Sequence, residues 1–312
     1  MGLEDGKPQA PDKTLEKRSP RRSILGRKEY RMQAFLITAY KDFASLKELT
    51  AALSSHGLCF VHADRRGTIT AAQIDELNAM PNVRAIRKRK VNWGSIEHLY
   101  AMLDLCRMAL EDERTTYLHL MSAQDYPTLS GKEMESRFDG ETRLFIQRTR
   151  TADHPELAHR YEHYHFMHLL NYRDPSDWAQ NWVGRIDRWQ DMLHVRRKLS
   201  VPYKGLLYIS LPRDAAEFVL KDKNARRFLR QLRTTYIPEE FFFQNVFNET
   251  PFEAWIVNRQ LHFSIWDEPE RGLPAVLNGG DLERIDASGC CFARKIEGSG
   301  ALAKTLLERW DS

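Results

Sequence analysis

The chain has 312 residues, of which 42% are hydrophobic and 29% charged, a balance typical of a soluble globular enzyme with one large domain or two small ones. Its 47 basic and 43 acidic residues give a net charge of +4, which does not imply wholesale binding of nucleic acid. No apolar run approaches the roughly 18 residues of a membrane-spanning helix, and the N-terminus lacks the apolar core of a secretory signal.

The four cysteines indicate reduced thiols in a cytoplasmic protein. Cys59, Cys106, Cys290 and Cys291 do not have the spacing of metal ligands. Cys290 and Cys291 are adjacent, which suits neither zinc nor a mutual disulfide. We therefore expect no metal site built on cysteine.

Residues 1–30 are rich in Lys and Arg, contain three prolines and show almost no apolar pattern. This composition predicts a disordered basic tail, followed by a single domain over residues 31–312. A basic tail either stays solvated or contacts an anionic surface, so peripheral contact with the inner face of a membrane is one interpretation.

From residue 33 onward, short apolar runs alternate with helical patterns. Strands are predicted over 34–38, 58–62, 83–86 and 117–121, with helices over 43–56, 71–78 and 95–111 between them. Such alternation favours a parallel α/β sheet. Ligands gather at the carboxyl ends of strands in such sheets, where Asp64 and the turn 122–125 would lie.

The second half of the chain is less regular. Ser130 and Glu133 form a capping box that starts a helix. Residues 152–200 are predicted to be helical or loop-like and are crowded with His, Tyr, Trp and Arg. Further elements are predicted as a short apolar segment at 144–147, strands at 208–211 and 255–258, helices at 214–221, 224–232 and 301–310, and an apolar segment at 292–296.

The stretch 235–247 could carry catalysis. Pro238 is predicted as the first residue of a helix, which puts Glu239 and Glu240 in the first turn, near the positive end of the helix dipole. Phe243 and Phe247 follow at helical spacing and would anchor the helix in a core. A carboxylate held there suits a general base, although glutamates at this position also simply stabilise helices.

Several familiar catalytic signatures are absent from the sequence. There is no Walker loop, no GxGxxG after a strand, no HExxH, no GxSxG and no Asp-x-Asp in a turn that follows a strand. A protein of this kind that handles a nucleoside diphosphate would need cations instead of a metal. Lys295, Arg294 and Arg271 are the candidates to neutralise a departing pyrophosphate.

Six short motifs, in this order along the chain, resemble a known family. They are the apolar first strand, Val61-His62-Ala63-Asp64-Arg65-Arg66, Val91-Asn92-Trp93-Gly94-Ser95, His119 to Pro127 with its Ser122-Ala123-Gln124-Asp125-Tyr126-Pro127, Ile237-Pro238-Glu239-Glu240-Phe241-Phe242, and Phe292-Ala293-Arg294-Lys295. Together they resemble the core-2/I-branching β-1,6-N-acetylglucosaminyltransferases, which include the peptide O-xylosyltransferases. The likeness runs from about residue 33 to residue 296, and departs from the family at Tyr40, at 205–208 and through 141–200.

The resemblance implies a fold and a set of residue roles. The fold would be a single GT-A-like α/β domain with a mixed, mainly parallel central sheet flanked by helices. By position, Glu240 matches the catalytic base, Lys295 the pyrophosphate-binding lysine and Asp64 the nucleotide-binding turn, while Arg271 lies one position from the second phosphate-binding residue. Cleft residues would be Trp93, Ser122, Gln124, Asp125, Tyr126 and Tyr208. A tryptophan such as Trp93 is more often a core residue, and Asp125 and Tyr126 would also fit a plain turn.

The predicted function is that of a metal-independent, inverting glycosyltransferase in polysaccharide biosynthesis. It would need no cofactor and would move N-acetylglucosamine from a UDP-sugar to a hydroxyl of a glycan or another acceptor. Three alternatives stay open: a UDP-xylose donor, a non-catalytic sugar- or nucleotide-binding protein, and a nucleic-acid-binding protein that uses the tail and residues 87–90. Glu239 is expected to contribute only through the helix dipole, because adjacent residues on a helix point about 100° apart.

Overall fold

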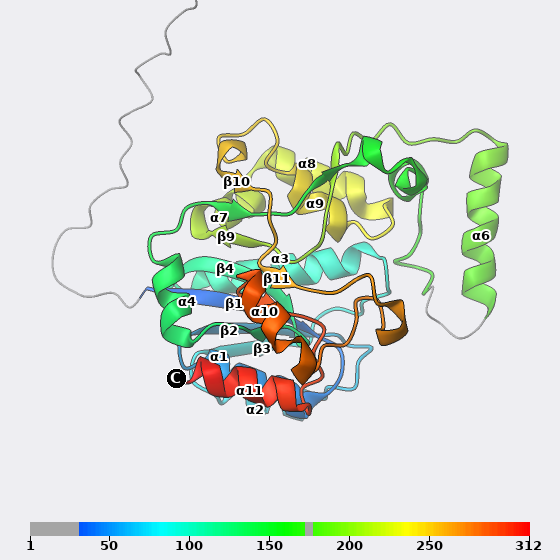
Figure 1. Cartoon of the computed structure of the whole chain (residues 1–312). Helices are drawn as coiled ribbons and strands as arrows, with labels where there is room; N and C mark the ends of the chain where they lie inside the picture. The colour runs from blue at the N-terminus through cyan, green and yellow to red at the C-terminus, as the bar shows by residue number, and fades with distance from the viewer. Residues whose placement is uncertain (1–30, 172–176) are drawn as a thin grey trace, which may run out of the picture. The chain divides into compact units, whose positions relative to one another are not determined.

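The computed structural model describes residues 31–171 and 177–312 (Figure 1). The predicted basic tail, residues 1–30, lies outside the described residues, so the predicted domain boundary stays a prediction. Within the described ranges, every helix is too short or too polar to cross a membrane.

A seven-stranded sheet forms the centre of the domain and is mainly parallel. Its strands, in spatial order, are β10 (Ile256–Val257), β6 (Leu144–Phe145), β9 (Ser210–Pro212), β4 (Thr115–Ser122), β1 (Met32–Ala39), β2 (Gly57–Ala63) and β3 (Val83–Ile86). Only β9 runs against its neighbours, pairing antiparallel with both β4 and β6. The predicted mixed, mainly parallel α/β sheet is therefore confirmed.

Helices cover both faces of this sheet, as the apolar runs of β1 and β2 require. On β1, Phe35 and Ile37 belong to one buried cluster and Ala34 and Leu36 to the other, because successive side chains of a strand point to opposite faces. The first cluster includes α1 (Phe43–Leu53), α2 (Ala71–Asn78), α4 (Gly131–Phe138), α10 (Leu282–Ser288) and α11 (Ala301–Trp310). The second includes α3 (Ile96–Glu111), α7 (Arg213–Lys221), α8 (Lys223–Gln231) and α9 (Glu239–Asn245).

Two small sheets complete the described structure. In the first, β12 (Phe292–Ala293) lies between β11 (His262–Phe263) and β5 (Tyr126–Pro127). The second pairs β7 (Thr149–Arg150) with β8 (Tyr203–Lys204). Between them in sequence are the helices α5 (His159–Glu162) and α6 (Asp177–Met192), within the segment that was predicted to be helical or loop-like.

Local sequence signals account for most element boundaries. The predicted bounds of α2, β3 and α11 match those observed, and Ser130 and Glu133 form the expected capping box at the start of α4. Most other boundaries differ from the predicted ones by one to three residues. Tyr208 precedes β9 instead of belonging to it, and Pro238 is the residue before α9, with a helical φ of −66°.

Candidate functional site

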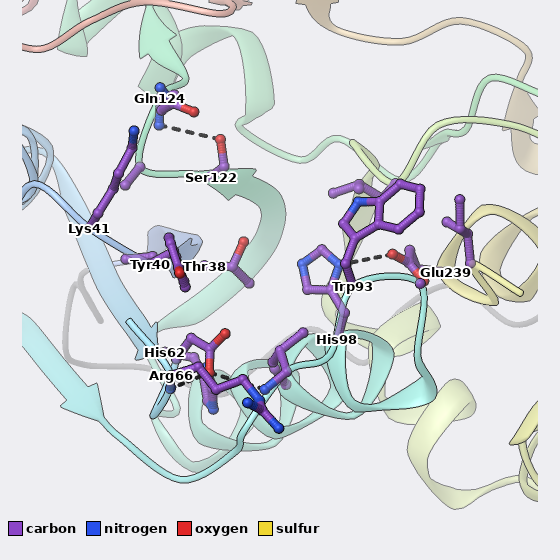
Figure 2. Close-up of a pocket in the computed structure, with 18 of the residues that line it drawn as sticks. Thr38, Tyr40, Lys41, His62, Arg66, Trp93, His98, Ser122, Gln124 and Glu239 are labelled. Carbon is purple, nitrogen blue, oxygen red and sulfur yellow. Dashed lines mark hydrogen bonds and ion pairs between the residues drawn. The ribbon is translucent and has the colours of Figure 1, made fainter. Parts of the chain in front are cut away.

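A cavity of about 780 Å³ opens at the carboxyl ends of β1, β2 and β4. It is lined there by Thr38 to Lys41 at the end of β1, His62 and Asp64 at the end of β2, and Ser122 to Gln124 at the end of β4. Figure 2 shows Thr38, Ser122 and Gln124 across this cavity from Trp93, His98 and Glu239. The parallel part of the sheet thus creates the site where its strands end, as expected.

Asp64 organises the turn after β2. Its Oδ1 accepts hydrogen bonds from the backbone N–H groups of Arg66 (2.9 Å) and Val91 (3.0 Å). Its own N–H donates to the carbonyl of Ala39, which ties the turn to the end of β1. Gly67 is required in this turn, since a Cβ there would lie 1.9 Å from the carbonyl oxygen of Tyr40. The carboxylate is thereby held at the cavity, with its Oδ1 bound to the backbone.

His62 lies beside this turn as a neutral imidazole. Burial lowers its pKa to about 4, against the opposing charges of Asp104 and Asp64. Its Nε2 accepts a hydrogen bond from the backbone N–H of Arg89 at 3.1 Å, so the proton is on Nδ1. His62 therefore presents a polar but uncharged ring to the cavity.

Glu240 lines the cavity from the first turn of α9 and pairs with Arg160 of α5. Arg160 Nη2 donates to Glu240 Oε2 at 2.9 Å, and the guanidinium is held further by the carbonyls of Tyr236 and Ile237. Burial raises the pKa of Glu240, and the opposing charge of Arg160 offsets only part of this effect. The carboxylate is therefore more basic than an ordinary glutamate, as a general base should be.

Glu239 also lines the cavity, which differs from the expectation that only one of the two glutamates would face it. Its Oε1 lies 2.9 Å from Nδ1 of His98 on α3, and the residue is only 4% exposed. Burial would lower the pKa of His98, but the hydrogen bond and charge of Glu239 outweigh burial and raise it. Because His98 offers Glu239 a partner inside the fold, its contribution extends beyond the helix dipole.

Of the candidate cations, Lys295 alone lines the cavity. Arg294 is buried instead, with its Nε donating to Oδ1 of Asp125 at 2.9 Å and its guanidinium carbon 4.0 Å from the ring centre of Tyr208. Arg271 is in a 3₁₀ turn (Pro269–Arg271) outside the cavity and is paired with Glu268 and Asp281. Of the adjacent cations Arg294 and Lys295, only Lys295 therefore lines the cavity, and Arg294 is buried.

The remaining predicted cleft residues divide into two groups. Trp93, Ser122 and Gln124 line the cavity, and the ring of Trp93 meets that of Tyr236 edge-on at 5.5 Å. Asp125, Tyr126 and Tyr208 are buried behind the wall and do not line it. Asp125 and Tyr126 follow the cavity-lining turn, but their side chains point into the core.

Sequence reasoning missed Arg160 and His98, which hold the two glutamates. Arg160 belongs to the histidine- and tyrosine-rich segment 159–165, within the residues 152–200 that were predicted only to be helical or loop-like. No residue of this segment lines the cavity, and His163 and His165 face Asp187 of α6. His98 follows the capping residue Ser95 by three positions, which puts it on the first turn of α3. Among residues 31–171 and 177–312, no three His, Cys, Asp or Glu side chains gather closely enough to hold a metal ion.

Comparisons with known proteins identify a family that this chain resembles. The model of the family described as Core-2/I-Branching enzyme matches residues 33–286. A human N-acetyllactosaminide β-1,6-N-acetylglucosaminyl-transferase is 26% identical over 85% of this chain and 68% of its own length. The β-glucuronosyltransferase GlcAT14B of Arabidopsis thaliana is 29% identical over 34% of this chain and 26% of its own length.

Solved structures are more distant. The bifunctional glycosyltransferase WbbM has a TM-score of 0.41 and 10% identity, over 93% of this chain and 53% of its own. S. aureus TarS 1–349, in complex with UDP-GlcNAc, has a TM-score of 0.28 and 10% identity, over 37% of this chain and 34% of its own. These scores are low, and nothing about the substrate of this chain follows from them.

Proposed function

This chain belongs to the Core-2/I-branching enzyme family, a family of glycosyltransferases, and from that premise we propose that it is a metal-independent, inverting transferase. Its donor would be UDP-N-acetylglucosamine and its acceptor a hydroxyl of a glycan. The donor assignment rests on the human relative, whose name specifies β-1,6-N-acetylglucosaminyl transfer. The carrying observation is that Glu240 and Lys295, a base and a cation, line one cavity at the ends of parallel strands.

The chemistry assigns Glu240 to the acceptor side. The acceptor oxygen attacks the anomeric carbon from the face opposite UDP, and its proton passes to the Glu240 carboxylate. A new carbon–oxygen bond forms as the bond to the diphosphate breaks, so the configuration inverts. The raised pKa of Glu240 supports this role, since a stronger base takes the proton more readily.

Lys295 would act on the leaving group. UDP departs with the electron pair of the broken bond, and a cation beside the diphosphate stabilises that charge. The Asp64 turn, with Trp93 and the neutral His62, would receive the nucleoside. Asp64 still has an oxygen, Oδ2, with no hydrogen bond to another described residue, and it can accept one from a ribose or base.

Donor binding is the first test, because it needs no acceptor. Thermal denaturation is followed with UDP, UDP-N-acetylglucosamine and UDP-xylose, and a true ligand at 100 times its Kd stabilises the fold by about 2.7 kcal/mol. Lys295→Met should remove most of this shift, whereas Lys304→Met, at an exposed site on α11, should not. A larger shift with UDP-xylose than with UDP-N-acetylglucosamine would indicate that UDP-xylose is the donor. No shift with any uridine ligand would refute the proposal.

Catalysis itself is tested by UDP release. The preferred donor is incubated with a panel of glycans, and UDP release that depends on the acceptor is expected. Donor binding without transfer to any acceptor and without donor hydrolysis would favour a non-catalytic sugar-nucleotide-binding protein. Contact of residues 1–30 with anionic lipid, and a cytoplasmic location, remain predictions from the sequence.

A further inference from the structure

The adjacent residues Arg294 and Lys295 divide between the core and the cavity. Lys295 lines the cavity, whereas Arg294 is 8% exposed. The Nε of Arg294 donates to Oδ1 of Asp125 at 2.9 Å. Arg294 is not among the residues that line the cavity, and its guanidinium has a buried carboxylate as its partner.

Asp125 connects this ion pair to Ser122 at the end of β4. It has no exposed surface, and its Oδ2 accepts the backbone N–H of Ser122 at 2.5 Å. The N–H of Asp125 donates in turn to the carbonyl of Ser122. One carboxylate therefore fixes both Arg294 and the turn 122–124, whose residues line the cavity.

An aromatic ring and an imidazole lie beside the pair. The Tyr208 ring packs against the guanidinium of Arg294, and His262 lies behind Asp125, with its Nε2 at 3.9 Å from Oδ2. Burial and the nearby Arg294 lower the pKa of His262 far below its usual range, so this ring is neutral. The aspartate and the arginine thus depend on each other for charge balance.

The backbone around Lys295 is fixed from both sides. The N–H of Arg294 donates to the carbonyl of Phe263, and that of Ile296 to the carbonyl of Gln124. The carbonyl of Lys295 accepts from Leu277. Because a lysine side chain is long and flexible, the place from which it starts decides where its ammonium can reach.

We propose that Asp125 and Arg294 form a buried clamp that positions Lys295 and the turn 122–124 as one wall of the donor site. Arg294 is then a positioning residue that does not touch the diphosphate. This inference rests on the proposed function, in which Lys295 binds the pyrophosphate. It departs from the sequence-based expectation that Arg294 binds UDP directly.

A double-mutant cycle tests the clamp. The affinities of UDP and of uridine are measured by calorimetry for Asp125→Asn, Lys295→Met and the combination of both. Asp125→Asn keeps an oxygen for the Ser122 N–H but leaves Arg294 without its charge partner. We expect about a tenfold loss of UDP affinity, typical of a displaced charged hydrogen bond, and unchanged uridine affinity. In the Lys295→Met background, the same change should cause no further loss.

The control removes an ion pair of similar length away from the cavity. Asp286→Asn breaks the exposed pair with Arg309 (2.6 Å) and should leave both affinities unchanged. If Asp125→Asn fails to fold, Asp125→Asn with Arg294→Met removes both buried charges and takes its place in the cycle.

Four other outcomes would contradict either the clamp or the proposed function. Additive losses of UDP affinity in the cycle would overturn the clamp, because they would indicate that Arg294 acts on UDP independently of Lys295. Equal losses for UDP and uridine would also overturn it, as would an unchanged UDP affinity. Failure of the unaltered protein to bind UDP would instead refute the proposed function before any variant is compared.

Discussion

Replacing Glu240 with glutamine separates its chemical role from its structural one. Glutamine keeps the shape and one oxygen that can accept from Arg160, but it loses the negative charge and the basic oxygen. General-base catalysis contributes about 10²–10⁴-fold, so Glu240→Gln should lower the transfer rate by about 10² or more. Affinity for UDP should stay within about twofold, because in the proposed mechanism this residue acts on the acceptor.

The structural cost of the same change is small by comparison. Arg160 retains its contacts with the carbonyls of Tyr236 and Ile237, and its guanidinium lies 5.0 Å from the ring centre of Phe241. Exchanging a charged hydrogen bond for a neutral one costs about 1 kcal/mol of unfolding free energy. The melting temperature should therefore fall by about 2 °C. A loss of this size cannot account for the expected loss of rate.

Glu239→Gln is the matched control, and it should show the reverse pattern. The residue is buried against His98, and its Oε2 has no hydrogen-bond partner among the described residues. An amide NH₂ at that position would be an unsatisfied buried donor, which costs about 1–3 kcal/mol of stability. We expect Glu239→Gln to be the less stable variant, with a loss of rate below about tenfold.

Transfer rates, UDP affinity and melting temperatures of the two variants decide between these roles. If Glu239→Gln abolishes transfer while Glu240→Gln stays active, the assignment is wrong by one residue. If both variants stay active, the base lies elsewhere and the proposed mechanism fails.

Four further predictions concern the whole protein. Transfer should persist in EDTA, because Lys295 is proposed to replace a metal at the diphosphate; activity lost to the chelator and restored by manganese would contradict this. The pH profile of kcat/KM should fall on the acid side with an apparent pKa above the usual 4.5 of a glutamate, since burial raises the pKa of Glu240 and protonation removes the base. The His98–Glu239 pair should stabilise the fold fully below about pH 6.5 and lose this effect as pH rises through the raised pKa of His98, which melting curves of the protein and of His98→Asn would reveal. Deleting residues 1–30, a segment without apolar periodicity, should leave the melting temperature and UDP binding unchanged, and a marked fall in either would move the domain boundary.

The sequence predicted best where local signals act alone. The predicted capping box at Ser130 and Glu133 sets the start of α4, and the apolar runs of β1 and β2 form the predicted strands. Topology then predicted part of the site, because the ends of parallel strands meet at one edge and bring Asp64 and Ser122 to the same cavity.

Contacts between distant segments explain what could not be predicted. Arg160 meets Glu240 across 80 positions and His98 meets Glu239 across 141, and no local pattern specifies either pair. The pair Arg294-Lys295 illustrates the same limit. Both are cations after an apolar strand, and only the place of Asp125 in the fold decides which of them is buried.

The parallel strands and the Arg294–Lys295 segment are made at very different times during translation. The four strands β1 to β4, with the Asp64 turn, are complete once residue 122 has been synthesised. The partner of Asp125, Arg294, is synthesised 169 residues later, and only then can β12 pair with β5 and place Lys295 at the cavity. On the ribosome, the half of the cavity proposed to receive the nucleoside can therefore form long before the half proposed to hold the diphosphate. Neither Asp125 nor Arg294 has its buried charge balanced until residue 294 has been made, so the proposed donor site is completed together with the core around β12.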